Sequence, residues 1–291
     1  MSPAMQELLD ILDLERLEHN LYRGRSPKTS WQRVFGGQVV GQALVAAQRT
    51  VDAGRHVHSL HSYFMRPGDS SLPIIYEVER LRDGGSFTTR RVTAIQNGEA
   101  IFSLEASFQV EEEGLDHQLP IPLDVPPPDA VLSAHEVIET YGERVPENIR
   151  RYWARERQVE MKPVFIEHYT SRAKLPPVQQ VWIRLAGPVP DDRATQSVLL
   201  AYVSDLTLLD TSTFAHGRAL FDSDIQAASL DHAMWFHRPD KLDGWLLYSQ
   251  DSPSASGARG FTRGLIYAQD GILVASVAQE GLIRLRRMPS S

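Results

Sequence analysis

Three polar residues stand where the sequence otherwise favours apolar side chains. Asp205 lies in the run QSVLLAYVSDLTLLD, which is nearly all apolar from Val198 to Leu209. An ionised carboxylate among leucines is costly unless another group pairs with it. Ser229 and Gln279 follow in strand-like segments. Together an acid, a hydroxyl and an amide can hold one water, with the acid as general base, so the three predict direct hydrolysis of an activated acyl compound.

An internal repeat sets these residues apart. SYFMRP at 62–67 returns as MWFHRP at 234–239, an offset of 172 residues at the shared Arg-Pro. QNGEAIFS at 96–103 returns as QDGILVAS at 269–276, an offset of 173 residues. The sequence therefore predicts two copies of one structural unit.

The two copies differ at the candidate residues. By these offsets Ser229 corresponds to Val57, and Gln279 corresponds to Ala106. The apolar helix expected at residues 36–51 contains no acid up to Thr50, whereas the second apolar helix is expected to contain Asp205 in its interior. The asymmetry favours one shared site in the second half.

Each copy reads as a buried helix followed by antiparallel strands. The segment 36–51 is apolar on almost every face, as expected for a helix enclosed by a sheet. A further packing helix is expected at residues 5–17. Asn-Gly at 97–98 is a strong hairpin signal. Strands are expected at His56–Met65, Leu72–Leu81, Phe87–Gln96, Glu99–Val110 and from Ile225 to Pro239. The fold class is α+β, with a sheet wrapped around one long helix in each unit.

The chain divides into two units and a connector. Acidic residues and prolines replace the strand pattern in EEEGLDHQLPIPLDVPPP, at 111–128. We expect an N-terminal domain with its leading helix at 1–110, a linker and connector at 111–157, and a C-terminal domain with the candidate catalytic residues at 158–291.

Composition narrows the class of function. The net charge of −7 disfavours nucleic acid and anionic membranes as partners. The 291 residues include no cysteine, which removes disulfides and thiolate chemistry and fits a reducing cytoplasm. The N-terminus lacks a signal-peptide pattern, and no apolar run approaches the roughly 18 residues of a membrane span. We expect a cytoplasmic protein that needs no cofactor.

Several motifs resemble one family over nearly the whole chain. They are FGGQVVGQAL (35–44), HSLHSYFMRPGD (58–69), SDLTLL (204–209), DHAMWFHRP (231–239) and SGARGF (256–261). They resemble acyl-CoA thioesterase II, the TesB family. The resemblance implies a double hotdog fold and hydrolysis of medium- to long-chain acyl-CoA to fatty acid and CoA. It also implies a homo-oligomer, either a dimer or a tetramer.

The resemblance also implies a catalytic set of Asp, Thr or Ser, and Gln that activates water. Those roles fall on Asp205, Ser229 and Gln279. Bacterial members of the family are expected to have Thr at the place of Ser229, and Ser keeps the hydroxyl but loses the methyl group that stiffens the side chain.

Other residues are weaker candidates for substrate binding. Gly36 and Gly37 begin a helix and leave backbone N–H groups approachable by a ligand. Arg259 and Arg263 could meet the phosphates of CoA. His58 could take part in catalysis. In HVHSLH only His56 and His58 share one face of the strand, so a third ligand is missing there and no metal site is expected.

Two alternatives stay open from the residues. A hotdog enoyl-CoA hydratase is expected to carry a His five residues after its Asp, and here that residue is Asp210. The other alternative is a non-catalytic acyl-CoA-binding protein. A Ser-His-Asp relay is not expected, because Asp231 and His232 are adjacent and face opposite ways on a strand.

Overall fold

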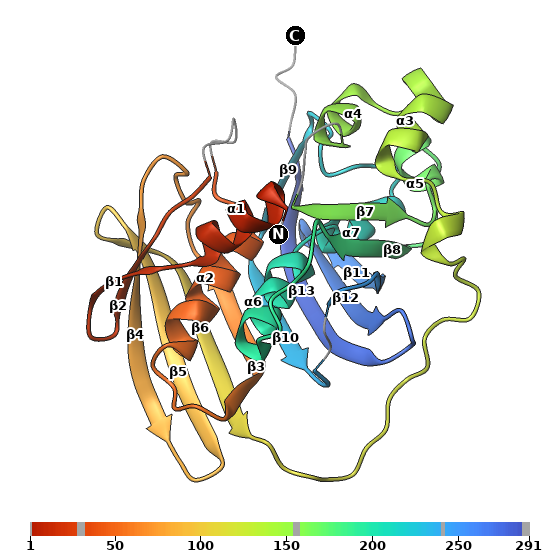
Figure 1. Cartoon of the computed structure of the whole chain (residues 1–291). Helices are drawn as coiled ribbons and strands as arrows, with labels where there is room; N and C mark the ends of the chain where they lie inside the picture. The colour runs from red at the N-terminus through yellow and green to blue at the C-terminus, as the bar shows by residue number, and fades with distance from the viewer. Residues whose placement is uncertain (1, 28–32, 154–157, 240–241, 287–291) are drawn as a thin grey trace.

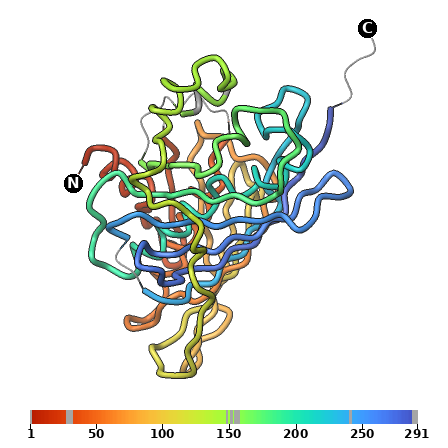
Figure 2. The backbone as a smooth tube through the Cα atoms, turned by 90° about the vertical axis from the view of Figure 1, so that its right-hand side faces the viewer, coloured from red at the N-terminus to blue at the C-terminus, as the bar shows by residue number. Residues whose placement is uncertain are grey.

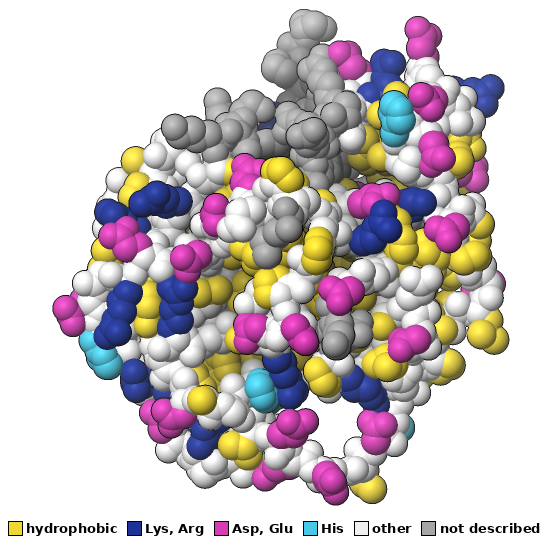
Figure 3. All heavy atoms as spheres, viewed as in Figure 1, with side chains coloured by type: hydrophobic (Ala, Val, Ile, Leu, Met, Phe, Trp, Pro, Cys, Tyr) yellow, Lys and Arg dark blue, Asp and Glu magenta, His cyan; other side chains and the backbone are white. Residues whose placement is uncertain are grey.

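Two helices, α2 (Gly36–Gln48) and α6 (Arg193–Ser204), lie side by side against one face of a large sheet in the computed structural model (Figure 1). The structure describes residues 2–27, 33–153, 158–239 and 242–286. In the space-filling view, basic and acidic side chains interleave over the face shown (Figure 3). Among the described residues, no helix combines the length and the apolar character needed to cross a membrane.

The helices and strands follow the repeat. The first half contains, besides α2, the elements α1 (Pro3–Leu12), β1 (Glu15–Glu18), β2 (Leu21–Gly24), β3 (Arg55–Phe64), β4 (Ile74–Asp83), β5 (Phe87–Gln96) and β6 (Glu99–Val110). The connector contains η1 (Pro128–Ala130), α3 (Ala134–Tyr141), η2 (Gly142–Arg144) and α4 (Glu147–Trp153). The second half contains, besides α6, the elements β7 (Val159–Pro163), α5 (Glu167–Thr170), β8 (Val178–Leu185), η3 (Leu208–Asp210), α7 (Thr211–Phe214), β9 (Ile225–Ser229), β10 (Asp231–Phe236), β11 (Leu246–Ser256), β12 (Arg259–Ala268) and β13 (Leu273–Leu285).

One antiparallel sheet joins the two halves. In the described part of the chain its strand order is β1-β2-β4-β5-β6-β3-β10-β13-β12-β11-β8-β7, with β9 paired to β13. Tyr63 pairs with Asp231 and Ser59 pairs with Trp235, symmetrically about the pair of His61 and Ala233. The repeat offset therefore relates the halves by an approximate two-fold axis at the β3–β10 junction. The expected α+β double hotdog architecture is confirmed.

The sheet curves around both helices (Figure 2). Val40, Ala43, Leu44 and Ala47 on α2 are all fully buried, because α2 packs against α6 on one side and strands on the other. This enclosure explains why the segment is apolar on almost every face. Helix α1 is shorter than expected, because Asp13 adopts an extended conformation and ends it.

A bulge breaks the strand that was expected to run from Ile225 to Pro239. Leu230 separates β9 from β10, and its N–H bonds the carbonyl of Glu280. The register of β3 shifts at the equivalent place, between Val57 and Ser59. A bulge changes which side chains face a given side of the sheet. It therefore turns His232 to the buried face of the sheet.

The connector leaves the sheet after β6 and passes around the outside of the second half (Figure 1). Residues 111–127 form no helix or strand. The side chain of Gln118 donates to the carbonyl of Gly271 and accepts from the N–H of Leu273. Arg238 pairs with Asp116. These bonds attach the acidic segment to the second unit.

Candidate active site

Asp205 lies at the junction of the two central helices. The sequence predicted it inside a helix, but α6 ends at Ser204 and Asp205 is its C-terminal cap. Its Oδ2 accepts a hydrogen bond of 2.9 Å from the backbone N–H of Gly37, in the first turn of α2. The acid of the second half therefore contacts the helix of the first half.

The surroundings of Asp205 bring the pKa of its carboxyl group close to neutral pH. Burial raises the pKa of Asp205 to about 7, although hydrogen bonds from Gly37, Gln279 and Ser229 favour its ionised form. The C-terminal end of its own helix disfavours negative charge, whereas the N-terminal end of α2 favours it. A carboxyl group with this pKa can accept a proton from water near neutral pH.

The structure brings the three predicted residues together. Ser229 on β9 lies opposite Gly281 on β13, two residues beyond Gln279. The Nε2 of Gln279 donates to the Oγ of Ser229 at 2.8 Å, and both side chains also bond Asp205. The acid, hydroxyl and amide therefore form one connected group.

The two glycines allow α2 to approach the acid. A Cβ at Gly36 would lie 2.6 Å from the Oδ2 of Asp205, and one at Gly37 would lie 2.3 Å from the carbonyl oxygen of Tyr202. The sequence interpretation offered both N–H groups to a ligand. The structure corrects this for Gly37, since its N–H already bonds Asp205.

Three other candidates lie away from Asp205. Arg259 pairs with Glu280, and Arg263 pairs with Asp251. Both arginines are exposed and alternate along β12 with the buried Thr262, so they face the side of the sheet opposite Gln279.

His58 bonds Ser107 on the neighbouring strand. The ring of Phe64 lies beside Gly36, and thus beside Asp205. Phe64 comes six positions after His58, roughly 20 Å along β3. The structure therefore does not bring His58 to the acid.

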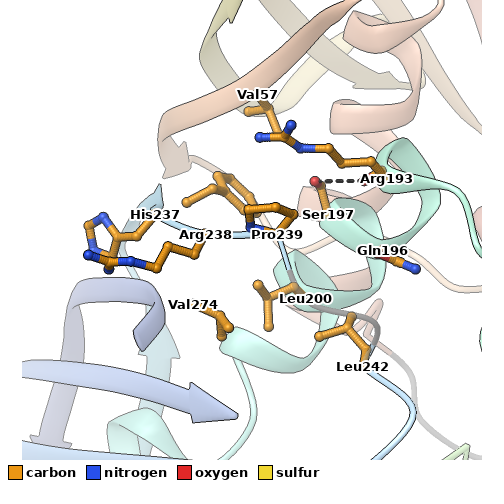
Figure 4. A pocket seen from close by; sticks show the side chains of 11 residues that line it. Val57, Arg193, Gln196, Ser197, Leu200, His237, Arg238, Pro239, Leu242 and Val274 are labelled. Atoms are coloured by element: carbon orange, nitrogen blue, oxygen red, sulfur yellow. Dashed lines mark hydrogen bonds between the residues drawn. The ribbon is translucent and has the colours of Figure 1, made fainter. Parts of the chain in front are cut away.

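Figure 4 shows a pocket near the opposite end of α6 from Asp205. Its lining includes Arg193, Val57 and Phe236. By the repeat offset Val57 and Phe236 are the counterparts of Ser229 and Phe64. The pocket is therefore the counterpart of the candidate site under the approximate two-fold symmetry, with Val57 in the place of Ser229 and thus without the hydroxyl.

His232 is a buried polar neighbour that the sequence interpretation did not select. Its Nδ1 lies 2.7 Å from the Oε1 of Gln279, and its Nε2 lies 2.8 Å from the Oγ of Ser204. The repeat contained the signal, because His232 corresponds to the fully buried Leu60. The face toward which its side chain points could not be predicted, because the alternation of residue types along the strand does not reveal the bulge at Leu230.

The structure describes no group of three or more His, Asp or Glu side chains that could hold a metal ion among residues 2–27, 33–153, 158–239 and 242–286. The polar group around Asp205 can instead bond a water molecule directly. The described residues contain this group in the second unit and not in the first. The fold and the site therefore define a double hotdog protein whose two units differ at this site.

Comparison with known proteins identifies the family. The family model "Acyl-CoA thioesterase" matches residues 150–282, and "Acyl-CoA thioesterase N-terminal domain" matches residues 25–109. The chain is 41% identical to human acyl-coenzyme A thioesterase 8, over 95% of this chain and 88% of the relative. It is 39% identical to acyl-CoA thioesterase 2 of Haemophilus influenzae, over 98% of this chain and 99% of the relative.

A solved structure agrees with these relatives. The acyl-CoA thioesterase II TesB2 of Mycobacterium marinum is 46% identical, with a TM-score of 0.78, over 96% of this chain and 98% of that chain. The chain belongs to the acyl-CoA thioesterase family. It is a thioester hydrolase that acts on acyl-CoA.

Proposed function

We propose that Asp205, Ser229 and Gln279 carry out the hydrolysis by activating one water. The observation that carries this proposal is the hydrogen-bonded convergence of the three side chains beside the first turn of α2. Asp205 is the general base, while Ser229 and Gln279 orient the water. A thiol-release assay on acyl-CoA with alanine variants of Ser229 and Gln279 tests these assignments.

The proposed step balances without a covalent enzyme intermediate. The water oxygen bonds the thioester carbonyl carbon while its proton passes to Asp205. The C–S bond of the tetrahedral intermediate then breaks. The CoA sulfur leaves with the proton held by Asp205, and the acyl group leaves as the fatty acid. Because the first backbone N–H groups of a helix lack partners within it, those of Gly36 and Gln38 are our candidates for the oxyanion.

The pH profile tests Asp205 as the base. Only its ionised form can accept a proton, and its pKa lies at about 7. We expect kcat/KM to rise about tenfold per pH unit below this value and to level above it. The measurement is initial rate against pH from 5 to 9 with one short-chain acyl-CoA. A flat profile from pH 5 to 8 would exclude a base with this pKa.

A mostly apolar pocket near the site, with Thr207, Asp210 and Tyr169 as its polar lining, is our candidate for the acyl chain. It is lined by Ile149, Trp153, Met161, Pro163, Tyr169, Thr207, Asp210 and Phe221. Thr207 is two residues from Asp205, so their Cα atoms lie within about 7 Å of each other. A chain of medium or greater length suits such apolar walls.

Filling this pocket should shorten the preferred chain. In Met161→Trp we expect kcat/KM to fall about tenfold for a long acyl-CoA and to change less than twofold for a short one. The comparison uses both substrates with the same enzyme preparation. Equal losses for the two substrates would place the acyl chain elsewhere.

Oligomeric state and location complete the proposal. Tyr63 and Trp235 are 65% and 37% exposed on the paired strands β3 and β10, an aromatic surface suited to a second copy of the chain. We expect a dimer or a tetramer, which light scattering measures.

A cytoplasmic location fits the absence of cysteine, and fractionation of the source cells tests it.

A further inference from the structure

His232 is a wholly buried histidine that bonds side chains through both ring nitrogens. Gln279 lies at Nδ1 and Ser204 lies at Nε2. Burial lowers the pKa of His232 to about 4, so the ring is neutral around pH 7 and carries one hydrogen. Which nitrogen carries that hydrogen is decided by the neighbouring groups.

The neighbouring groups allow one consistent arrangement. An ionised carboxylate only accepts hydrogen bonds, so Gln279 must direct its NH2 group toward Asp205 and Ser229. The amide oxygen of Gln279 then faces His232, which must donate from Nδ1.

The other ring nitrogen completes the arrangement. With its hydrogen on Nδ1, the Nε2 of His232 accepts from the hydroxyl of Ser204. The same hydroxyl lies 2.8 Å from the carbonyl oxygen of Ala201, which competes with the Nε2 of His232 for the single hydroxyl hydrogen. In the arrangement that satisfies both ring nitrogens, Ser204 donates to His232 and His232 donates to Gln279.

The repeat gives independent support. The counterpart of His232 in the first half is Leu60, which is fully buried. The counterpart of Gln279 is Ala106, also buried. The first half builds the same strands without this chain of polar groups. His232 therefore accompanies the site and is not required by the strand itself.

We propose that His232 is a positioning residue that fixes which end of the Gln279 amide faces Asp205 and the attacking water. While Asp205 is ionised, the carboxylate itself requires the NH2 end. Once Asp205 has taken the proton of the water, it becomes a donor and could bond a reversed amide. The Nδ1–H of His232 opposes that reversal by binding the amide oxygen. The proposal rests on the role proposed above for Gln279.

Two substitutions at His232 test the proposal through kcat. His232→Leu introduces the residue that Leu60 supplies in the first half, so it suits the fold. It should lower kcat about 30-fold and leave KM within twofold, because the amide loses its anchor while substrate contacts remain. His232→Asn keeps an N–H donor near the Nδ1 position and should recover kcat to within about fivefold of wild type.

A matched control separates positioning from packing. His237, which directly follows β10, also bonds a serine on β13, Ser276, but it lies outside the candidate site. His237→Leu should leave kcat within twofold. Equal kcat in His232→Leu and wild type, or no recovery in His232→Asn relative to His232→Leu, would overturn the proposal.

The pH profile gives a readout that packing alone would not move. In His232→Leu a reversed amide can accept from protonated Asp205, which favours the neutral form. We expect the midpoint of the profile to rise by about half a unit to one unit. Among the described residues, the titratable side chain of Tyr248 on β11 also interacts with Asp205, and burial keeps Tyr248 neutral in both proteins. An unmoved midpoint would count against control of the amide by His232.

Nitrogen-15 NMR of the imidazole tests the arrangement without catalysis. The wild-type protein should show His232 protonated at Nδ1 and unprotonated at Nε2. A ring protonated at Nε2 would refute the positioning proposal even if Gln279 proves essential. Full activity of Gln279→Ala would instead refute the proposed role of Gln279, whatever the tautomer.

Discussion

Replacing Asp205 with asparagine is expected to lower kcat by about a thousandfold or more while the protein still binds acyl-CoA. The substitution preserves size and the bond from the N–H of Gly37, but an amide cannot take a proton from water. Turnover is measured by thiol release, and binding is measured by calorimetry with a non-hydrolysable thioether analogue of acyl-CoA. A variant with a tenth of wild-type kcat would exclude Asp205 as the base.

Asp231→Asn is the matched control. Asp231 is close in sequence to Ser229, but its carboxylate accepts a bond from the backbone N–H of Glu280. We expect kcat within about threefold of wild type. A loss comparable to that of Asp205→Asn would show that the assay responds to any acid removed near the strand.

Asp205→Asn is also expected to change how the free energy of unfolding depends on pH. The folded pKa of about 7 exceeds the usual value of 3.8, so the folded state binds more protons than the unfolded state between these values. Stability therefore falls as pH rises through this window, by on the order of 4 kcal/mol at pH 8. Asparagine does not titrate. Asp205→Asn should match or exceed the Tm of wild type at pH 8, with a smaller difference at pH 5.

Gly36→Ala is expected to lower kcat about a hundredfold with little change in Tm. The new Cβ would lie 2.6 Å from the Oδ2 of Asp205, so the carboxylate must move away from its place. A displacement near 1 Å in a catalytic group costs about that factor. Alanine otherwise suits a helix better than glycine. The measurements are kcat and Tm for the same preparation.

Gly41→Ala on the same helix is its control. There the nearest atom to the new Cβ is the side-chain tip of Leu12, at 2.8 Å, which can rotate away. We expect kcat within twofold. If Gly36→Ala retained wild-type kcat, close approach of α2 to Asp205 would have no catalytic role.

The sequence predicted more of the architecture than of the local geometry. The repeat at the two Arg-Pro sites predicted paired units, and the register about His61 and Ala233 has that symmetry. Strand alternation failed at Leu230, because a bulge inserts one residue without changing the residue types around it. That failure concealed His232 as a neighbour of Gln279.

The sequence by itself determined the family, the two-unit plan and the residues that distinguish the halves, because these depend on residue type and periodicity. Only the tertiary structure decided how those residues meet. Asp205 contacts Gly37, which is 168 residues away along the chain, because α2 and α6 pack with opposite ends together. It also decided that Arg259 and Arg263 face the other side of the sheet from Gln279. The direction in which a side chain points and the residues that it contacts depend on tertiary packing, which a local sequence pattern does not specify.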